Sequence, residues 1–154
     1  MKELIDRLKE YNLTISSCES LTGGLFAAKI TSISGASKVF KGALVTYKND
    51  VKAALLGVDI LEIEKYGAIS EQTAHLMATK VKSITGSDVA VSFTGNAGPD
   101  VLENKDVGLV FIGVAFKDEV KVHKCRFSGD RNKIREDCIL YAKTVIMAEL
   151  DGNK

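Results

Sequence analysis

The chain has 154 residues, a length that predicts one domain over 1–154 and burial of roughly two thirds of the surface of the unfolded chain. Lys and Arg total 21 against 20 Asp and Glu, so the net charge of +1 gives no reason to expect a nucleic-acid or membrane partner. The longest apolar run, 107–116, is far shorter than the ~20 residues that cross a bilayer, and the N-terminus lacks the apolar centre of a signal peptide, so we expect a cytoplasmic protein.

The first half of the chain predicts an N-terminal helix followed by two pairs of strand and helix. Apolar residues at helical spacing mark the first helix, and β-branched and aromatic residues mark the longer strand. In order, the predicted elements are a helix over 1–12, a strand over 13–16, a helix from Gly23 to about Gly35, a strand over 39–47 and a helix over 49–57.

The second half adds further helices and strands in alternation. The predicted elements are helices over 59–67 and 70–86, strands over 88–95, 107–116 and 119–127, and a last helix over 130–150. Ser70 is available as an N-cap. Interleaved helices and strands predict an α/β fold, a three-layer α/β/α sandwich with a mixed sheet. The irregular stretch 95–106 contains the single proline, Pro99, and loops of this length inside domains are often functional.

The segment 16–24, SSCESLTGG, joins a predicted strand to a predicted helix through two glycines. Backbone N–H groups at such a turn attract anions, but the P-loop ending and the three spaced glycines of dinucleotide-binding folds are absent. The same donors can hold the oxyanion that forms when a hydroxyl attacks a carbonyl group, which makes Ser20 a candidate nucleophile. The alternative is that Ser20 or Thr22 only caps the helix.

A serine nucleophile needs a base, and neither His75 nor His123 has an acidic residue at a telling offset. A lysine can replace histidine if its pKa falls. Lys52 lies in the first turn of a helix that Asn49 would cap, where the helix dipole disfavours a cation by roughly 0.3–1 kcal/mol. Desolvation or nearby cations would have to supply most of the shift. The alternative is a solvated surface lysine.

Three of the four arginines, Arg126, Arg131 and Arg135, lie within ten residues. Arg131 and Arg135 are four apart and share one face of the last predicted helix. Two guanidinium groups at a helix N-terminus suit a phosphate. The alternative is a solvated helix face that pairs with Glu136 and Asp137.

Six stretches of the chain resemble, in order, the C-terminal domain of the competence/damage-inducible protein CinA, and together they cover nearly the whole chain. They are ESLTGG (19–24), GALVTYKNDVKAALLGV (42–58), GAISEQTAHLMA (67–78), FTGNAGPD (93–100), VGLVFIGVAF (107–116) and FSGDR (127–131). The family includes enzymes that hydrolyse nicotinamide mononucleotide to nicotinate mononucleotide and ammonia in pyridine-nucleotide recycling. The resemblance therefore implies an amide hydrolase for a small-molecule nucleotide, without a metal or cofactor, in a homo-oligomer.

The resemblance also implies catalytic roles for Ser20, Lys52 and Tyr47. In this hypothesis Ser20 attacks the carboxamide, Lys52 exchanges the proton, Tyr47 orients or relays that proton, and N–H groups of the turn receive the oxyanion. The residues that we expect at the substrate are Glu19, Thr22, Gly23, Gly24, Thr94, Gly95, Asn96, Gly98, Arg131 and Arg135. Glu19 could instead anchor the turn or form a plain salt bridge, and the glycines of 94–98 could simply serve a turn that needs positive φ.

Four alternatives remain to be weighed. Cys18 points the same way as Ser20 on an extended strand, and a thiolate is intrinsically the better nucleophile, but it precedes the glycine turn by too many residues to share the donors. His123 and Cys125 lack a third metal ligand nearby. A nucleotide-binding or regulatory module without turnover is the main alternative function, and a role on DNA finds little support in the charge. In the family the loop continues with glycines and Lys-Pro, whereas this chain has VLENKD at 101–106, with Asp106 at the proline position.

Overall fold

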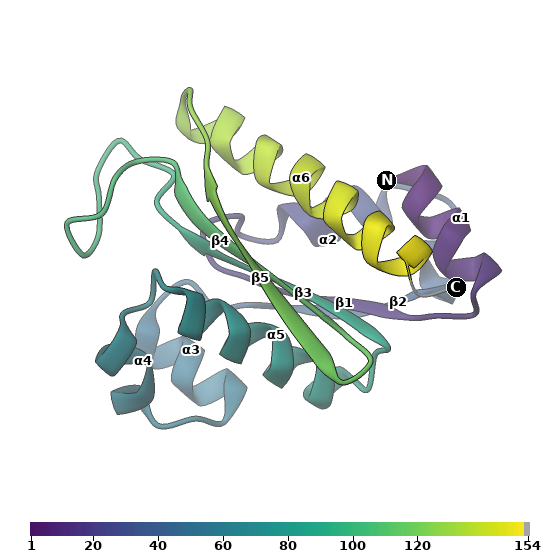
Figure 1. Cartoon of the computed structure of the whole chain (residues 1–154), viewed down its shortest axis with the longest axis horizontal. Helices are drawn as coiled ribbons and strands as arrows, with labels where there is room; N and C mark the ends of the chain where they lie inside the picture. Colours follow the sequence, from purple (N-terminus) through teal and green to yellow (C-terminus); the bar gives the residue numbers. More distant parts are fainter. Residues whose placement is uncertain (153–154) are drawn as a thin grey trace.

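A five-stranded mixed sheet forms the middle layer of the molecule, which the computed structural model describes over residues 1–152 (Figure 1). The strands are β1 (Ile15–Glu19), β2 (Phe40–Val45), β3 (Val89–Gly95), β4 (Leu109–Phe116) and β5 (Glu119–Arg126). They lie in the order β2-β1-β3-β4-β5. β1 pairs in parallel with β2 and β3, whereas β4 pairs antiparallel with β3 and β5. The predicted mixed sheet is confirmed.

Helices cover both faces of this sheet, as the predicted three-layer sandwich requires. On one face lie α1 (Lys2–Glu10), α2 (Leu25–Thr31) and α6 (Arg131–Gly152), and on the other lie α3 (Asn49–Leu56), α4 (Ile60–Tyr66) and α5 (Glu71–Thr85) (Figure 1). A short 3₁₀ helix, η1 (Ala36–Lys38), precedes β2. None of the helices within residues 1–152 is long and apolar enough to cross a membrane.

Each face of the sheet has its own apolar core. Phe26 of α2 packs on Phe93 of β3, with ring centroids 5.6 Å apart, in the core beneath α1, α2 and α6. On the opposite face Cys18 joins Leu56 and Met77. The strand β1 is buried at all five positions because it lies between the two cores. Parallel strands that are covered on both faces are typically buried in this way.

The helix starts match the sequence at α5 and differ from it at α3. The Ser70 side chain accepts a hydrogen bond from the Thr73 N–H at 3.1 Å, so its prediction as an N-cap is confirmed. Lys48 is the N-cap of α3, and the prediction that Asn49 caps this helix is wrong by one residue. Lys52 nevertheless lies in the first turn of α3.

The topology places the carboxyl ends of the parallel strands β1, β2 and β3 at the same end of the sheet. The chain leaves β1 through α2 on one face and reaches β2, and it then crosses the other face through α3, α4 and α5 to reach β3. Successive crossovers on opposite faces place β1 at a switch point, and ligands of open α/β sheets bind outside the carboxyl ends of the strands at such a point.

Candidate active site

A cavity of about 250 Å³ opens at the carboxyl ends of β1 and β3. Its walls come from the turn after β1, the segment after β2, the loop after β3 and the start of α6. The lining residues are Ser20, Leu21, Tyr47, Lys48, Gly95, Asn96, Ala97, Gly98, Asp100, Leu102 and Arg131. The structure therefore brings four segments that are far apart in the sequence to one hollow.

Ser20 follows the last residue of β1 and lies on the cavity wall. Its backbone N–H extends the sheet by one hydrogen bond, to the Phe93 carbonyl at 3.0 Å. Its side-chain hydroxyl makes no hydrogen bond to any residue within 1–152. The backbone is thus fixed while the hydroxyl remains available to a ligand.

Glu19 points to the other face of the strand end, where its carboxylate is completely buried. It accepts hydrogen bonds from the N–H groups of Gly24, Phe26 and Ala27 at 3.0–3.1 Å, and from the Ser17 hydroxyl at 3.0 Å. A carboxylate at the positive end of α2 satisfies N–H groups that have no partner within the helix. The structure places Glu19 as an anchor of the glycine turn and away from the cavity lining.

The glycine turn uses two of the N–H groups that the sequence analysis assigned to the oxyanion. The Gly23 N–H donates to the Ser20 carbonyl at 3.0 Å, and the Gly24 N–H donates to Glu19. Among residues 1–152, the N–H groups of Leu21 and Thr22 have no hydrogen-bond partner. The sequence assigned the oxyanion to the amides of Thr22, Gly23 and Gly24, and of these the Gly23 N–H closes the turn and the Gly24 N–H binds Glu19. The Thr22 N–H stays available as expected, and the Leu21 N–H is a second available donor that the sequence did not indicate.

Lys52 is completely buried, which excludes the alternative of a solvated surface lysine. Its amine donates to the Thr46 carbonyl at 2.6 Å and lies 3.5 Å from the Thr46 hydroxyl. Burial lowers the pKa of the Lys52 ammonium, whereas the Cys18 sulfur, where ionised, and the Glu103 carboxylate act to raise it. The described residues offer Lys52 no ion pair. Its amine is therefore held in an environment that favours the neutral form.

The amine of Lys52 and the hydroxyl of Ser20 emerge near the same strand ends without touching in this structure. The Thr46 N–H bonds to the carbonyl of Glu19 at 2.9 Å, so the residue that holds Lys52 pairs with the residue that precedes Ser20. No hydrogen bond joins Ser20 to Lys52 within residues 1–152. Catalytic hydrogen bonds of ligand-free sites often tighten only with substrate bound.

Cys18, the rival nucleophile, lies beneath the site. Its side chain is fully buried, and its sulfur is 3.5 Å from the Thr46 hydroxyl. Burial raises the pKa of the Cys18 thiol to about 11, so the reactive thiolate is scarce at neutral pH. Cys18 does not line the cavity, and we find no support for it as the nucleophile.

Tyr47 and Arg131 form a bridge over one side of the cavity. Arg131 donates from Nη2 to the Tyr47 hydroxyl at 2.7 Å and from Nη1 to the Gly98 carbonyl at 2.6 Å. Tyr47 is 55% exposed, and its hydroxyl has no hydrogen bond to Ser20 or Lys52. The structure thus joins Tyr47 to an arginine of α6 and to the loop after β3, a contact that the sequence did not predict.

Arg135 lies one turn further along α6 and makes different contacts. Its Nε donates to the Leu21 carbonyl at 3.1 Å, and its Nη2 donates to the Thr22 carbonyl at 2.8 Å. Arg135 does not line the cavity, although Arg131 does. The two arginines therefore do not form one phosphate grip, and the third arginine of the cluster, Arg126, pairs with Asp106 at 2.8 Å on the surface.

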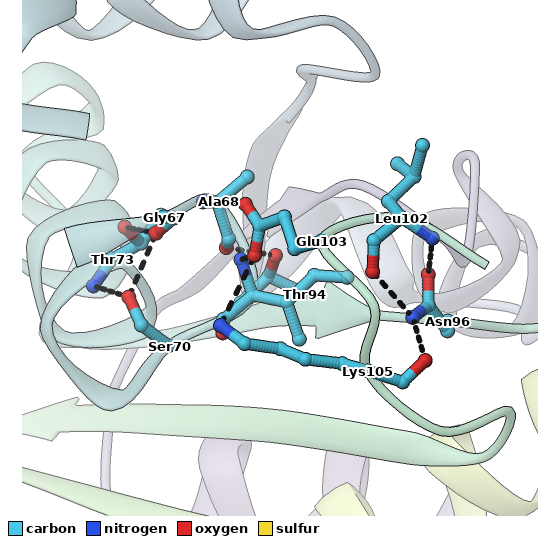
Figure 2. A network of polar contacts seen from close by, with 10 residues as sticks. Gly67, Ala68, Ser70, Thr73, Thr94, Asn96, Leu102, Glu103 and Lys105 are labelled. Atoms are coloured by element: carbon cyan, nitrogen blue, oxygen red, sulfur yellow. Dashed lines mark hydrogen bonds and ion pairs between the residues drawn. The ribbon is translucent and has the colours of Figure 1, made fainter. Parts of the chain in front are cut away.

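The loop after β3 is held by polar side chains, as Figure 2 shows. Asn96, only 3% exposed, donates from its amide to the carbonyls of Leu102 and Lys105 and accepts from the Leu102 N–H, at 2.9–3.1 Å. All three contacts lie within the loop, so the Asn96 amide that was expected at the substrate is already occupied. Thr94 also faces inward, because its hydroxyl donates to the Ala68 carbonyl at 2.6 Å.

Glu103 fastens the tip of this loop to the segment that precedes α5 (Figure 2). Its carboxylate accepts from the N–H groups of Ala68 and Ile69, at 2.5 and 3.1 Å, and pairs with Lys105 at 3.1 Å. A side chain at Gly67 would place its Cβ 2.8 Å from this carboxylate, so the contact requires glycine there. The loop departs from the family pattern and yet has its own anchor.

Three residues at or near the site were not predicted from the sequence to have a role there. Lys48 lines the cavity, Thr46 holds Lys52, and Glu103 ties down the loop. A lysine directly after a predicted strand was a visible signal for Lys48. For Thr46 and Glu103 there was none, because their partners are backbone groups distant in the sequence.

Other features of the described residues offer weaker sites. A hollow of about 450 Å³ lies near the loop between β4 and β5, with lining residues that include Lys82 and Asp118 but no paired nucleophile and base. Residues 1–152 contain no group of three metal-ligating side chains. Neither histidine lines the cavity at Ser20.

Comparison with known proteins identifies the family of the chain. Residues 1–150 match the family described as the CinA C-terminal domain. A protein of Bacillus subtilis named competence-damage inducible protein is 44% identical over 98% of this chain, and one of Thermoanaerobacter sp. is 45% identical over the whole chain. The chain spans 36% and 38% of the length of these two relatives.

Solved structures share the whole architecture. The competence/damage inducible protein CihA of Agrobacterium tumefaciens is 35% identical, with a TM-score of 0.91 over 97% of this chain and 92% of that one. The competence or damage-inducible protein of Enterobacter asburiae has a TM-score of 0.93 at 26% identity, covering 97% of this chain and 94% of that one. The fold and the family thus rest on sequence and structure together.

Proposed function

The chain belongs to the CinA C-terminal domain family, and we propose that it hydrolyses the carboxamide of nicotinamide mononucleotide to nicotinate mononucleotide and ammonia, a substrate that the family resemblance implies and a reaction that the site supports. The observation that carries the proposal is the unbonded hydroxyl of Ser20 on the cavity wall, near the strand ends where the buried amine of Lys52 is held without an ion pair. A serine with a neutral lysine as its base is a recognised form of nucleophilic catalysis.

The first half of the reaction forms an ester. Lys52 takes the proton of the Ser20 hydroxyl while the Ser20 oxygen attacks the carboxamide carbon. The carbonyl oxygen becomes an oxyanion, and the unpaired N–H groups of Leu21 and Thr22 stabilise it. Lys52 then returns the proton to the amide nitrogen, the C–N bond breaks, and ammonia leaves the nicotinoyl ester on Ser20.

The second half releases the acid. A water molecule attacks the ester carbon and gives its proton to Lys52, and the same donors receive the oxyanion. The bond to Ser20 breaks, the serine oxygen regains a proton from Lys52, and nicotinate mononucleotide departs. Neutral Lys52 begins each half of the cycle, which is why burial of its amine supports the proposal.

Arg131 is the residue that we assign to the phosphate of the substrate. It lies on the cavity wall with an exposed guanidinium, whose two recorded hydrogen bonds leave other N–H groups to bind a second acceptor. The loop 101–106 lines the same cavity through Leu102, so we expect its departure from the family pattern to affect substrate preference.

The alternative is a nucleotide-binding module without turnover, and one observation favours it. No hydrogen bond within residues 1–152 joins Ser20 to Lys52, as a serine already activated by its base would require. Under this alternative the protein binds nicotinamide mononucleotide but releases no ammonia.

Ammonia release from nicotinamide mononucleotide by the purified chain decides between the two functions. We expect Ser20→Ala to lower kcat by about 10⁴-fold or more while binding of the nucleotide, measured by calorimetry, changes little. Ser34→Ala, at an exposed serine remote from the cavity lining, is the matched control. Ammonia release by Ser20→Ala at the rate of the control would exclude the serine mechanism, and binding without ammonia from the unsubstituted chain would establish the binding module.

A further inference from the structure

The guanidinium of Arg135 lies against the backbone that follows Ser20. Its Nε and Nη2 donate to the carbonyls of Leu21 and Thr22, and its Nη1 contacts the Asn132 side chain at 3.4 Å. A guanidinium fork donates along fixed directions in one plane. Both directions that face the turn are therefore occupied by peptide carbonyls, which are neutral groups of the protein itself.

These two hydrogen bonds set the directions of the N–H groups that remain unpaired. A trans peptide unit is planar, with its C=O and N–H pointing opposite ways, so a fixed carbonyl fixes the N–H of the same unit. Arg135 holds the Leu21 carbonyl, and the N–H of that peptide unit belongs to Thr22. The free Thr22 N–H is thereby oriented from α6.

Arg135 also influences the direction of the Leu21 N–H, through one further hydrogen bond of the turn. The Thr22 carbonyl accepts from Arg135 at 2.8 Å and also from the Leu25 N–H at 3.0 Å. Its peptide unit carries the Gly23 N–H, which bonds to the Ser20 carbonyl at 3.0 Å. The Ser20 carbonyl shares its peptide unit with the Leu21 N–H. A continuous set of contacts therefore runs from Arg135 to both N–H groups that have no partner within residues 1–152.

We propose that Arg135 is a positioning residue for the proposed hydrolysis: it holds the peptide units after Ser20 so that the N–H groups of Leu21 and Thr22 receive the oxyanion. The inference rests on the proposed function. A cation that bonds to the carbonyl side of a peptide unit also polarises it, which makes the N–H of that unit a stronger donor. Arg135 thus acts on the reaction through the backbone and leaves the phosphate to Arg131.

Glu19 holds the other end of the same turn. Its buried carboxylate accepts the N–H groups of Gly24, Phe26 and Ala27. Arg135 binds carbonyls before Gly23, and Glu19 binds N–H groups after it, so the turn is held on both sides by charged groups of opposite sign. Donors that are fixed before the reaction begins stabilise an oxyanion without reorganisation.

Kinetics of Arg135→Ala on two acyl donors test the inference. With nicotinamide mononucleotide we expect kcat to fall about 100-fold while KM stays within about threefold, because donors shifted by an ångström lose transition-state stabilisation. With p-nitrophenyl acetate, which has no phosphate, we expect acylation of Ser20 to slow by a similar factor. A raised KM with unchanged kcat, together with full reactivity toward the ester, would overturn the inference in favour of a phosphate contact.

Two further variants separate positioning from charge and from folding. Arg135→Lys keeps the positive charge but cannot bond to both carbonyls, so we expect it to recover less than a tenth of the lost kcat. A Lys variant with nearly full kcat would contradict the inference. Lys133→Ala, at an exposed lysine of α6 paired with Asp137, is the control for changes in this helix. If Arg135→Ala unfolds, the Lys variant alone carries the test.

The ester also distinguishes failure of the inference from failure of the proposed function. A wild-type protein that is acylated at Ser20 but releases no ammonia from the nucleotide refutes the proposed substrate, and slower acylation of Arg135→Ala still supports the inference. A wild-type protein that releases ammonia, with Arg135→Ala equally fast on both compounds, refutes the inference alone. A wild-type protein that reacts with neither compound refutes both.

Discussion

Glu19 and Glu103 each anchor a segment that forms a wall of the cavity, Glu19 the turn after β1 and Glu103 the loop after β3, with different consequences. Each carboxylate accepts backbone N–H groups at the start of a helix, Glu19 at α2 and Glu103 just before α5. Glu19 is completely buried and makes four hydrogen bonds, whereas the Glu103 side chain is 27% exposed and shares its charge with Lys105. The difference lies in burial and not in the type of bond.

This difference in burial distinguishes two walls of the cavity: the turn after β1, which we call the buried wall, and the loop after β3, which we call the adjustable wall. The turn that carries Ser20 is held on one side by the completely buried carboxylate of Glu19, and hydrogen bonds of a buried group are strong and their loss is costly. The loop that Glu103 anchors carries exposed apolar side chains such as Val101 and Leu102, 45% and 66% exposed. We infer that the buried wall supports the chemistry and that the adjustable wall selects the substrate.

Replacement of Lys52 has the largest expected effect, because this buried amine is the proposed base. We expect Lys52→Met to lower kcat by about 10³-fold, the contribution of a positioned base. In the wild type, kcat/KM should rise with pH through the lowered pKa of Lys52, and the variant should lack this rise. A pH–rate profile of the two proteins is the measurement, and the same profile for both would exclude Lys52 as the base.

Lys52→Met should also change how the free energy of unfolding depends on pH. Between the lowered pKa of folded Lys52 and its usual pKa, the unfolded chain binds more protons, so the free energy of unfolding of the wild type should rise with pH in that window. Lys52→Met lacks this dependence, and its stability relative to the wild type should be highest at neutral pH and fall as pH rises. Urea unfolding at several pH values measures the difference, and a constant difference would contradict a depressed pKa.

Glu19→Gln tests the buried wall. A glutamine would turn an N–H₂ group toward backbone donors, so we expect the free energy of unfolding to fall by about 2–4 kcal/mol. Urea unfolding gives the value, with Glu64→Gln, at an exposed position of α4, as the matched control. A loss no larger than that of the control would show that burial of Glu19 does not strengthen its hydrogen bonds.

Asn96→Ala tests the adjustable wall by removing hydrogen bonds inside the loop after β3. It removes three hydrogen bonds that close the loop on itself, and we expect KM to rise about tenfold, near 1.4 kcal/mol, with a smaller change in kcat. Asn96→Asp keeps an acceptor for the Leu102 N–H and should give an intermediate KM. Steady-state kinetics measures both, and a large fall in kcat at constant KM would place Asn96 with the chemistry instead.

Glu103→Gln should have the smallest effect. Because its carboxylate is partly solvated, we expect a loss of about 0.5–1 kcal/mol in the free energy of unfolding. Removal of its negative charge should also lower the pKa of Lys52 further, since Glu103 raises it, and the rise of kcat/KM should move to lower pH. A shift to higher pH would show that the charge of Glu103 does not act on Lys52.

Much of the fold followed from local patterns. The apolar periodicity of 70–86 and the capping serine at its start depend on residues close in sequence, and the structure places α5 at Glu71–Thr85 with that cap. The buried wall was also partly visible, because the segment that ends in Gly23 and Gly24 has the composition of a strand, a tight turn and a helix. Ser20 and Arg131 were named from the sequence, and both line the cavity.

Local pattern could not assign the partners of polar side chains. Arg135 was predicted at the substrate, and Glu103 was not singled out in the sequence. Their partners in the structure, Leu21, Thr22, Ala68 and Ile69, are backbone groups that carry no sequence signal. The amides of Thr22, Gly23 and Gly24 were assigned to the oxyanion because glycines mark the turn, whereas the Gly23 N–H closes that turn and the Gly24 N–H binds the Glu19 carboxylate.

The sequence alone determined the order of helices and strands, the position of the glycine turn and the family, because each depends on residue types at short range or on motifs in a fixed order. Only the tertiary structure decided that Lys52 is enclosed, that Arg135 faces the turn and that Glu103 closes the loop. Burial and hydrogen-bond partners depend on which distant segments meet, and a strand order in which β1 lies between β2 and β3 is what brings these segments together.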